Sequence, residues 1–580
     1  MAFYNKALLA PKPAESPKHG FHASTLCLFP LLLLLHSSQI LADSPPSPSL
    51  DTICNFTPFP LFCKSLRPST NSASIHDHGR FAIHHSLSTT QHLLHLVNGY
   101  LNLPFSLSRI TIFALEDCQL LIGLNVDFLS RTIQTIDLTN TLRELEAEDT
   151  LTLLSAILTN QQTCSEGLLA TSPSLSIQNT LLSQLYEGSK LYGVSLALFR
   201  HGWVQDTKPG RRLMERNYAF EGGFGRQDHL PLRMSSQDQG IYESVSGRKL
   251  LQESGDYSDH VKVCQIVTAK QDGTGNFTTI NAAVAAAPNK TDSTNGYFLI
   301  YVAAGVYEEY VSIPKRKGYL MMIGDGIDQT VITGNRSVVD GWTTFNSATF
   351  AVTGEGFVAM NLTIRNTAGP AKHQAVALRN GADLSAFYSC SFEGYQDTIY
   401  VHSFRQFYRD CNVHGTVDFI FGNAAAVLQN CNLYARLPLK GQFNAITAQG
   451  RTDPNQNTGI SVHNCRIVAS PELASSNSTT KTFLGRPWKE YSRTVYLQSF
   501  MDGLIDPAGW TEWSGQFALE TLYYAEYGNR GPGSNTGYRV KWPGYHVINE
   551  TDAENFTVSC FIAGDGWLPY TGVPYRAGLI

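Results

Sequence analysis

The chain has 580 residues, more than one hydrophobic core normally supports, so two or more domains are expected. Apolar residues make up 43% of the chain and charged residues 16%, which is the balance of a folded protein. The formal net charge of −5 and the absence of a basic stripe argue against nucleic-acid binding.

Residues 1–42 have the features of a secretory signal peptide. Lys6, Lys12 and Lys18 precede the apolar run LCLFPLLLLL, which begins at Leu26. This run of about ten residues is shorter than the roughly 20 that a spanning helix needs, and small residues near Ala42 offer a cleavage point. An uncleaved membrane anchor is the alternative, because the segment before Leu26 is long. Secretion agrees with N-x-S/T sequons at Asn55, Asn276, Asn289, Asn335, Asn361, Asn477, Asn549 and Asn555.

Residues 48–200 are predicted to form helices. Leu120, Leu121, Leu124 and Phe128 recur at the spacing of one helix face, and a second such series begins at Leu151. Glycine is scarce, and Ser and Thr stand where helix caps are expected. These patterns predict an antiparallel four-helix bundle, whose apolar stripes serve as core and suggest no chemistry.

Residues 201–251 change in character and are predicted to be an exposed linker. Glycine and charge increase and the periodicity disappears. Two basic clusters lie here, RRLM from Arg211 and RKLL from Arg248. Solvated charge pairs are one interpretation of them. Proteolytic processing sites are the other, because cleavage concentrates where exposed chain joins two domains.

Residues 252–580 consist of short β-forming runs separated by Gly, Asn and Asp. Examples begin at Tyr297, Tyr319 and Arg493. Cys390, Cys411 and Cys431 are 21 and 20 residues apart, a spacing that suits successive coils of a parallel β-helix. A β-sandwich could produce similar strands, so the spacing alone leaves both folds open.

Two acidic motifs in this region are candidates for catalysis. GYQDTIY contains Gln396 and Asp397, and GTVDFIFGN contains Asp418. A carboxylate among β-forming and small residues is costly to bury unpaired, so such positions usually serve chemistry or a paired role. The later segment LGRPW adds Arg486 as a cation and Trp488 as a flat apolar face. Two carboxylates, an amide and an arginine suit hydrolysis of a polar substrate.

These motifs and their neighbours resemble the pectin methylesterases of plant cell walls. The resemblance includes QDGTGNFTTINAAVAAAP near Gln271, NTAGPAKHQAVALR near Gln374 and FIAGDGWLP near Trp567, and it covers essentially all of 260–580. CNFTPFPLFCKS at Cys54 and LTNQQTCSEG at Cys164 resemble the inhibitor-like region that precedes many of these enzymes. The resemblance implies a right-handed parallel β-helix over 252–580 behind an all-α inhibitor-like pro-domain.

The resemblance also assigns roles by motif. Asp418 would be the nucleophile that forms an acyl-enzyme, and Asp397 would be the general acid and then the base. Gln374 and Gln396 would stabilise the oxyanion. Arg486 would keep Asp418 ionised and contact the substrate, together with Gln374, Trp488 and, more weakly, Thr344. Each residue also has a structural interpretation: a turn or cap for the aspartates, an ion pair for Arg486, a polar ladder for the glutamines and core for Trp488.

Several further expectations follow from the resemblance. The expected substrate is pectin, and the activity would be that of a secreted pectinesterase of the plant cell wall. Its expected partners are its own pro-domain or separate inhibitor proteins of that bundle type, and a processing protease. RKLL matches the basic tetrads at which the family's pro-region is removed better than RRLM, which has Met214 in place of the usual leucine. No cofactor or metal is expected, because no Cys/His cluster has zinc spacing and no EF-hand loop is visible.

The cysteines give two further predictions. Cys54, Cys63, Cys118 and Cys164 form an even set with three possible connectivities. The resemblance favours Cys54–Cys63 and Cys118–Cys164. On a β-helix, Cys411 and Cys431 would be stacked neighbours, which suggests a disulfide between them.

Other functions remain open from sequence alone. A pectin lyase and a polygalacturonase are alternatives that share the β-helix. A third alternative, from a different functional class, is an inhibitor or binding protein that works through its helical bundle. The downstream half keeps every catalytic motif residue, which argues against this alternative for the whole chain. A structural wall glycoprotein would need Pro-rich repeats that are missing. His373 and His414 suggest a serine triad, but no GxSxG elbow supplies the serine, so both are interpreted as structural.

Overall fold

The computed structural model describes residues 49–66, 68, 73–102, 107–171, 177–204, 232–247, 261–476 and 479–580. The predicted signal segment 1–42, the basic clusters 211–214 and 248–251, and the sequon at Asn477 lie outside these ranges. No helix in the described ranges is long and apolar enough to cross a membrane.

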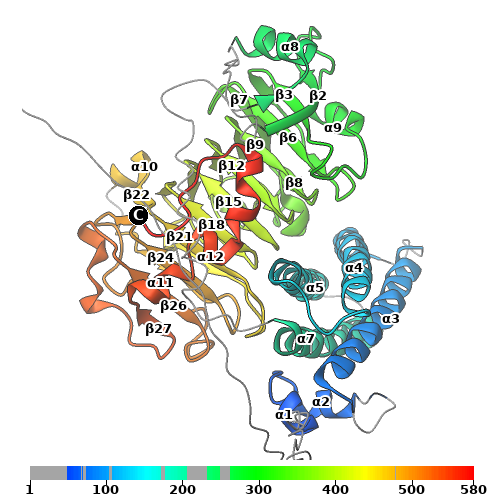
Figure 1. Ribbon diagram of the computed structural model, residues 1–580. Helices are drawn as coiled ribbons and strands as arrows, with labels where there is room; N and C mark the ends of the chain where they lie inside the picture. Colours follow the sequence, from blue (N-terminus) through cyan, green and yellow to red (C-terminus); the bar gives the residue numbers. More distant parts are fainter. Residues whose placement is uncertain are drawn as a thin grey trace, which may run out of the picture. The chain divides into compact units, whose positions relative to one another are not determined.

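Helices make up the described chain as far as Val204 (Figure 1). The long ones are α3 (Ile75–Leu101), α4 (Arg109–Ile136), α5 (Glu144–Ala170) and α7 (Ser183–Trp203), and the short ones are α1 (Leu50–Cys54) and α2 (Pro60–Ser65). Ser74 and Asp77 form a capping box at the start of α3, and Ser108 caps α4. Helix α3 packs against α4 and α7, and α5 packs against the same two helices, so the predicted four-helix bundle is confirmed.

The rest of the described chain is a parallel β-helix, as predicted. Its strands form three parallel sheets, and within each sheet neighbouring strands follow one another in chain order (Figure 1). The twelve-stranded sheet contains β1 (Leu232–Arg233), β2 (Val261–Ala269), β3 (Tyr297–Val302), β6 (Leu320–Gly324), β9 (Val358–Met360), β12 (Ser385–Tyr388), β15 (Arg405–Arg409), β18 (Ala425–Gln429), β21 (Gly459–His463), β24 (Arg493–Leu497), β26 (Tyr523–Tyr527) and β27 (Tyr545–Val547).

The other two sheets complete each coil. The eight-stranded sheet contains β4 (Gly305–Tyr307), β7 (Thr330–Gly334), β10 (Thr363–Asn366), β13 (Ser391–Glu393), β16 (Asn412–Gly415), β19 (Asn432–Ala435), β22 (Arg466–Ala469) and β25 (Phe500–Met501). The seven-stranded sheet contains β5 (Val311–Ile313), β8 (Phe350–Val352), β11 (Leu378–Asn380), β14 (Ile399–Val401), β17 (Ile420–Gly422), β20 (Asn444–Gln449) and β23 (Thr482–Gly485). Helices α9 (Ile280–Ala286), α10 (Pro471–Ala474), α11 (Glu550–Glu554) and α12 (Val558–Ile562) lie between or after the strands.

The interior of the β-helix is filled by residues that stack from coil to coil. One buried row in the eight-stranded sheet joins Ile364, Phe392, Val413, Leu433, Ile467 and Met501 in register. Burying each such side chain contributes roughly 1.5–3 kcal/mol relative to leaving it exposed. These stacks fix the register, and the register sets which outward-facing residues become neighbours.

The predicted linker 201–251 is partly structured, which corrects the expectation of an exposed connection throughout. Helix α7 continues to Trp203, strand β1 pairs with β2, and helix α8 (Ser236–Ser246) follows β1. Tyr242 of α8 is fully buried and lies edge-on to Tyr301, with ring centres 5.9 Å apart. Ile241 and Val245 of α8 pack beside Tyr242 against the same core cluster. Three apolar residues in one 11-residue helix give too weak a periodicity for sequence analysis to detect.

The cysteines divide into bonded and unbonded sets. Disulfides join Cys54 to Cys63 and Cys118 to Cys164. The prediction of a Cys411–Cys431 disulfide is wrong, because both thiols are unbonded and buried. The two residues do occupy equivalent positions, each directly before the paired residues Asn412 and Asn432. In-register parallel strands keep their Cβ atoms roughly 4.8 Å apart and their side chains parallel, whereas a disulfide needs Cβ atoms about 3.8 Å apart.

Candidate active site

The floor of the site is one in-register row on the outer face of the seven-stranded sheet. The row comprises Ala351, Arg379, Tyr400, Phe421 and Ala448. Arg486 follows directly after Gly485, the partner of Thr447, and so extends the row past β23. Residues on either side of this row, such as Ile399 and Ile420, point into the core, since side chains alternate along a strand.

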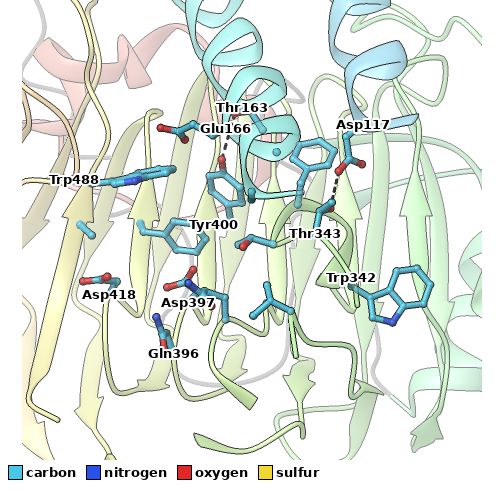
Figure 2. Close-up of a pocket in the computed structure, with 18 of the residues that line it drawn as sticks. Asp117, Thr163, Glu166, Trp342, Thr343, Gln396, Asp397, Tyr400, Asp418 and Trp488 are labelled. Carbon is cyan, nitrogen blue, oxygen red and sulfur yellow. Dashed lines mark hydrogen bonds between the residues drawn. The ribbon is translucent and has the colours of Figure 1, made fainter. Parts of the chain in front are cut away.

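Asp397 and Asp418 are equivalent residues of neighbouring coils. Each lies two residues before a strand residue of the pair Ile399 and Ile420, which are in register. Both adopt a left-handed backbone conformation, with φ of 65° and 52°. Such a conformation is uncommon for a residue other than glycine and costs about 1–3 kcal/mol, and it is found most often at functional sites. Figure 2 shows the two side chains in the same pocket.

Arg486 holds Asp418 through both of its carboxylate oxygens. The Arg486 Nε donates to Oδ1 over 2.8 Å, and Nη2 donates to Oδ2 over 2.7 Å. The guanidinium also lies 4.3 Å from the ring centre of Trp513 and 5.4 Å from that of Phe443. Aromatic rings and a bidentate carboxylate together fix the arginine in one orientation.

The two aspartates have different electrostatic surroundings, which shift their pKa values by different amounts. Burial, and after it the charge of Asp418, raise the pKa of Asp397 well above its ordinary value. Burial also raises the pKa of Asp418, but the hydrogen bonds and the charge of Arg486 act in the opposite direction. Two neighbouring buried carboxylates do not both ionise readily, so the shared proton belongs on Asp397 and the negative charge on Asp418.

The remaining residues named from sequence gather around this pair. Gln374, Gln396, Thr344 and Trp488 line the same cavity of about 590 Å³, which is the size of a small-molecule site. The side-chain amides of Gln374 and Gln396 make no hydrogen bond to any other described residue. Their N–H groups are therefore available to a ligand.

Aromatic residues that sequence analysis did not single out complete the floor. Tyr400 and Phe421 are stacked with ring centres 4.2 Å apart, and Trp488 stands edge-on to Phe421 at 5.9 Å. A Cβ on Gly450 would lie 2.8 Å from the Trp488 ring, so glycine is needed there to seat the indole. The sequence contained a signal for these two aromatic residues, because Tyr400 and Phe421 each follow the aspartate of one of the two acidic motifs by three residues.

The histidines that suggested a triad lie elsewhere. His414 stacks on Tyr434 with ring centres 4.5 Å apart, and burial lowers its pKa to about 4. Neither His414 nor His373 lines the cavity. Among the described residues, no group of three His, Cys, Asp or Glu side chains is placed to hold a metal ion.

Comparisons with known proteins identify the family. The pectinesterase family model matches residues 265–565, and the plant invertase/pectin methylesterase inhibitor model matches 48–198. The chain belongs to the pectinesterase family. It is 57% identical over 97% of its length to the whole of probable pectinesterase/pectinesterase inhibitor 20 of Arabidopsis thaliana. It is also 49% identical to pectinesterase 2 of Citrus sinensis, over 80% of this chain and 82% of the relative.

A solved structure supports the same assignment for the β-helix. The pectin methylesterase from carrot is 53% identical, and the match covers 56% of this chain and 100% of the carrot chain with a TM-score of 0.53. Because the carrot chain is matched over its whole length by about half of this one, a pectinesterase domain folds without a bundle. The chain is therefore a pectinesterase with an inhibitor-family domain in front of the enzyme.

The inhibitor-family domain packs against the pectinesterase site. A polar stripe on α5 provides hydrogen bonds: Thr163 contacts the His402 ring at 3.0 Å, and Thr159 accepts from Asn423 at 2.9 Å. Ser155 accepts through its backbone from Gln456 at 3.0 Å. Apolar side chains of the bundle also join Phe345, Tyr400, Phe421 and Ala448 in one buried cluster.

Two acidic residues of the inhibitor-family domain reach into the cavity. Glu166 of α5 forms an ion pair with Lys489, whose pKa is lowered to about 8 by burial. Asp117 of α4 is 4% exposed and accepts hydrogen bonds from Thr343 Oγ1 at 2.6 Å and from Asn346 Nδ2 at 2.5 Å. Burial raises the pKa of Asp117 to about 7, while the Thr343 hydrogen bond and the charge of Arg379 lower it and Glu116 raises it slightly.

Proposed function

We propose that the pectinesterase domain works as an aspartyl esterase that converts methyl-esterified pectin to pectate and methanol. The observation that carries this mechanism is the bidentate ion pair of Asp418 with Arg486, beside Asp397, whose pKa burial and the charge of Asp418 raise well above its ordinary value. Ester cleavage through an acyl-enzyme requires an ionised nucleophile and a protonated general acid.

The first half of the reaction transfers the acyl group to the enzyme. A carboxylate oxygen of Asp418 attacks the ester carbonyl carbon, and the N–H groups of Gln374 and Gln396 bind the oxyanion that develops. As the carbon–oxygen bond to the methoxy group breaks, Asp397 donates its proton and methanol leaves. Arg486 holds the attacking carboxylate in position throughout.

The second half returns the enzyme to its starting state. Asp397, now a carboxylate, takes a proton from water, and the resulting hydroxide attacks the acyl carbon of the anhydride with Asp418. The bond to Asp418 breaks, which releases a galacturonic acid unit and restores the carboxylate. Asp397 keeps the proton that it needs for the next methoxy group, so one water is consumed for each methanol.

The cavity suits a sugar polymer. Trp488, Tyr400 and Phe421 offer flat apolar faces for sugar rings, and the aspartate pair lies beside them. Lyase and polygalacturonase activities are not favoured, because the family that matches is pectinesterase. Action through the bundle alone is not favoured either, because the enzyme half carries its full motif set.

The inhibitor-family domain would restrain the enzyme within the same chain. Its residues cover the aromatic floor and line the cavity, so the domain occupies space that a pectin chain would need. A tethered domain has a high effective concentration, which makes even a modest affinity sufficient. A protease that cuts near Arg248–Leu251 in the secretory route or the cell wall would then release active enzyme. Separate inhibitor proteins of this type could bind the freed cleft.

Methanol release from esterified pectin by Asp418→Asn tests the proposed chemistry. Asp410→Asn is the matched control, since Asp410 has the same left-handed backbone with φ of 52° but does not line the cavity. Asp418→Asn should lose at least about 10³-fold in kcat while Asp410→Asn stays active. Unsaturated product or new reducing ends in place of methanol would reveal a lyase or a polygalacturonase. Near-normal methanol release from folded Asp418→Asn would refute the nucleophile.

A further inference from the structure

The turn that carries Gln396 and Asp397 is tied by its backbone to both neighbouring coils. This turn joins β13 to β14. Ala375 N–H, in the preceding coil, donates to the Gln396 carbonyl at 3.2 Å. Asp397 N–H donates to the Val417 carbonyl, in the following coil, at 3.1 Å. Ala375 directly follows Gln374, the second amide proposed for the oxyanion. The position of this one turn therefore sets the places of Asp397 and of both amides.

Arg436 holds the same turn with its side chain. Its Nη1 donates to the Gly394 carbonyl at 3.0 Å, and its Nη2 donates to the Tyr395 hydroxyl at 2.8 Å. The guanidinium also lies 3.9 Å from the centre of the Tyr395 ring. The remaining donor, Nε, contacts Glu472 Oε1 at 2.8 Å. Two hydrogen bonds and a cation–π contact thus fix the two residues directly before Gln396.

Arg436 reaches the turn from two coils away. Glu393 and Tyr434 are both in register with His414, which lies in the coil between them. Tyr395 and Arg436 each lie two residues further along the chain, so they occupy equivalent positions two coils apart. Neighbouring strands are about 4.8 Å apart, so roughly 10 Å separates the two backbones. Only a long side chain crosses the intervening coil, and the planar guanidinium brings its donors to the turn in a fixed arrangement.

Arg436 acts on the site without reaching into it, since it is not one of the residues that line the cavity. Burial is the largest cause of the raised pKa of Asp397; the charge of Asp418 raises it further, and that of Arg486 lowers it. Tyr400 is a further titratable neighbour of Asp397. The charge of Arg436 is not among these causes. Its effect on Asp397 therefore comes through the position of the turn, which keeps the carboxyl buried.

We propose that Arg436 is a positioning residue for ester hydrolysis, which holds the turn that carries Gln396 and Asp397 in its working position. The inference rests on the proposed esterase activity and deepens it. The site then depends on two arginines with separate tasks. Arg486 binds the nucleophile Asp418 directly, and Arg436 holds the general acid and the oxyanion amides from outside the cavity.

The experiment replaces Arg436 by glutamine in the pectinesterase domain from Leu232 to Ile580, since the carrot relative shows that such a domain folds alone. Methanol release from esterified pectin is measured across pH. Glutamine is too short to cross the intervening coil, so the turn loosens. The value of kcat should fall by about 10–10²-fold, as for a catalytic group that is misplaced by about 1 Å. KM should change little, because Arg436 does not line the cavity.

The pH profile separates a positioning role from general damage. The basic limb reports loss of the Asp397 proton, and the acidic limb reports ionisation of Asp418. In Arg436→Gln, water reaches the loosened Asp397 and lowers its pKa, so the basic limb should move to lower pH. The acidic limb should stay in place, since Arg486 still holds Asp418. Arg436→Lys keeps a long side chain with fewer directed donors and should show both effects in smaller size, and it serves as the test if Arg436→Gln fails to fold.

Three further variants show which contact of the guanidinium matters. Arg466→Gln makes the same change at an exposed arginine of the next coil and should match the unmodified domain. Glu472→Gln removes the ion pair but keeps the contacts with the turn, so it should also stay close to the unmodified values. Tyr395→Phe removes one of the two hydrogen bonds to the turn and should lower kcat less than Arg436→Gln does.

The Asp397 carboxyl can also be followed without turnover. The probe is an NMR titration of the domain labelled with carbon-13 at its aspartate carboxyl groups, with Asp397→Asn to identify the signal. A folded Arg436→Gln domain with unchanged kcat would overturn the proposal. A lower kcat with an unmoved basic limb and an unmoved Asp397 pKa would overturn it as well, because Arg436 would then be structural only. If the unmodified domain releases no methanol, the proposed activity fails, and a lowered Asp397 pKa in Arg436→Gln still establishes that Arg436 positions this carboxyl.

Discussion

Replacing Arg486 by glutamine should move the pH dependence of the enzyme. Arg486 donates two hydrogen bonds to Asp418, a residue that is 4% exposed, and it carries the positive charge that opposes the effect of burial on the Asp418 pKa. Glutamine is too short for the bidentate contact and is uncharged. Asp418 is then left as a buried carboxylate beside a second one, Asp397.

The size of the effect follows from the contacts. Removing one partner of a buried ion pair costs about 3–5 kcal/mol, because the other charge stays buried and unpaired. One pKa unit corresponds to 1.36 kcal/mol, so the pKa of Asp418 should rise by about two to four units. The nucleophile must be ionised, and a raised pKa therefore removes activity from the acidic side. At a fixed acidic pH the rate should fall by about 10²–10⁴-fold.

The assay is kcat/KM for methanol release across pH, with the domain from Leu232 to Ile580. The acidic limb of the profile should move to higher pH by about the calculated amount, and activity should partly recover as the pH rises. Arg466→Gln, the same change at an exposed arginine, should leave the limb in place. A uniform loss of activity at every pH with an unmoved limb would refute the reasoning, since Arg486 would then act on substrate binding alone.

Three further outcomes are expected. Asp397→Asn should abolish the basic limb of the pH profile and most of kcat, and a surviving two-limbed profile would rule out the acid–base role. Docking of the inhibitor-family domain should be strongest below about pH 4 and weaken as pH rises toward 7. Asp117 has its pKa raised to about 7 when docked, so docking takes up a proton; Asp117→Asn should flatten this dependence in a binding titration. Alanine at the basic residues of both clusters, 211–214 and 248–251, should leave uncleaved chain with low activity, and an active uncleaved chain would contradict the restraint.

The fold could be predicted because its repeats are visible in the sequence. A spacing of 21 residues between Asp397 and Asp418 equals one coil, so residues at that spacing stack, as the pairing of Ile399 with Ile420 shows. The helical periodicity of the bundle was equally direct. What the spacing could not decide was β-helix against β-sandwich, because both place short strands between turn residues.

The contacts between the two domains could not be predicted in the same way. The side of α5 that meets the pectinesterase domain carries Thr152, Ser155, Thr159, Thr163 and Glu166, at intervals of three and four residues. A polar stripe at helical spacing normally marks a solvent-facing side. Its hydrogen-bonding partners lie far away in sequence: Asn423 is 264 residues from Thr159, and His402 is 239 residues from Thr163. Nothing in the local sequence therefore distinguishes a solvent-facing polar stripe from one that is paired with another domain.

The direction in which a repeated position faces decides whether the repeat makes a core or a site. Cys411 and Cys431 repeat at nearly the same interval as Asp397 and Asp418, and both pairs stand just before short strands. The cysteines precede strands of the eight-stranded sheet and face the interior, where they form an apolar stack. The aspartates precede strands of the seven-stranded sheet and face the cavity. Stacking brings the two carboxylates close together in the cavity, so each disfavours ionisation of the other. Because Arg486 binds Asp418 and not Asp397, the negative charge is favoured on Asp418 and the proton on Asp397.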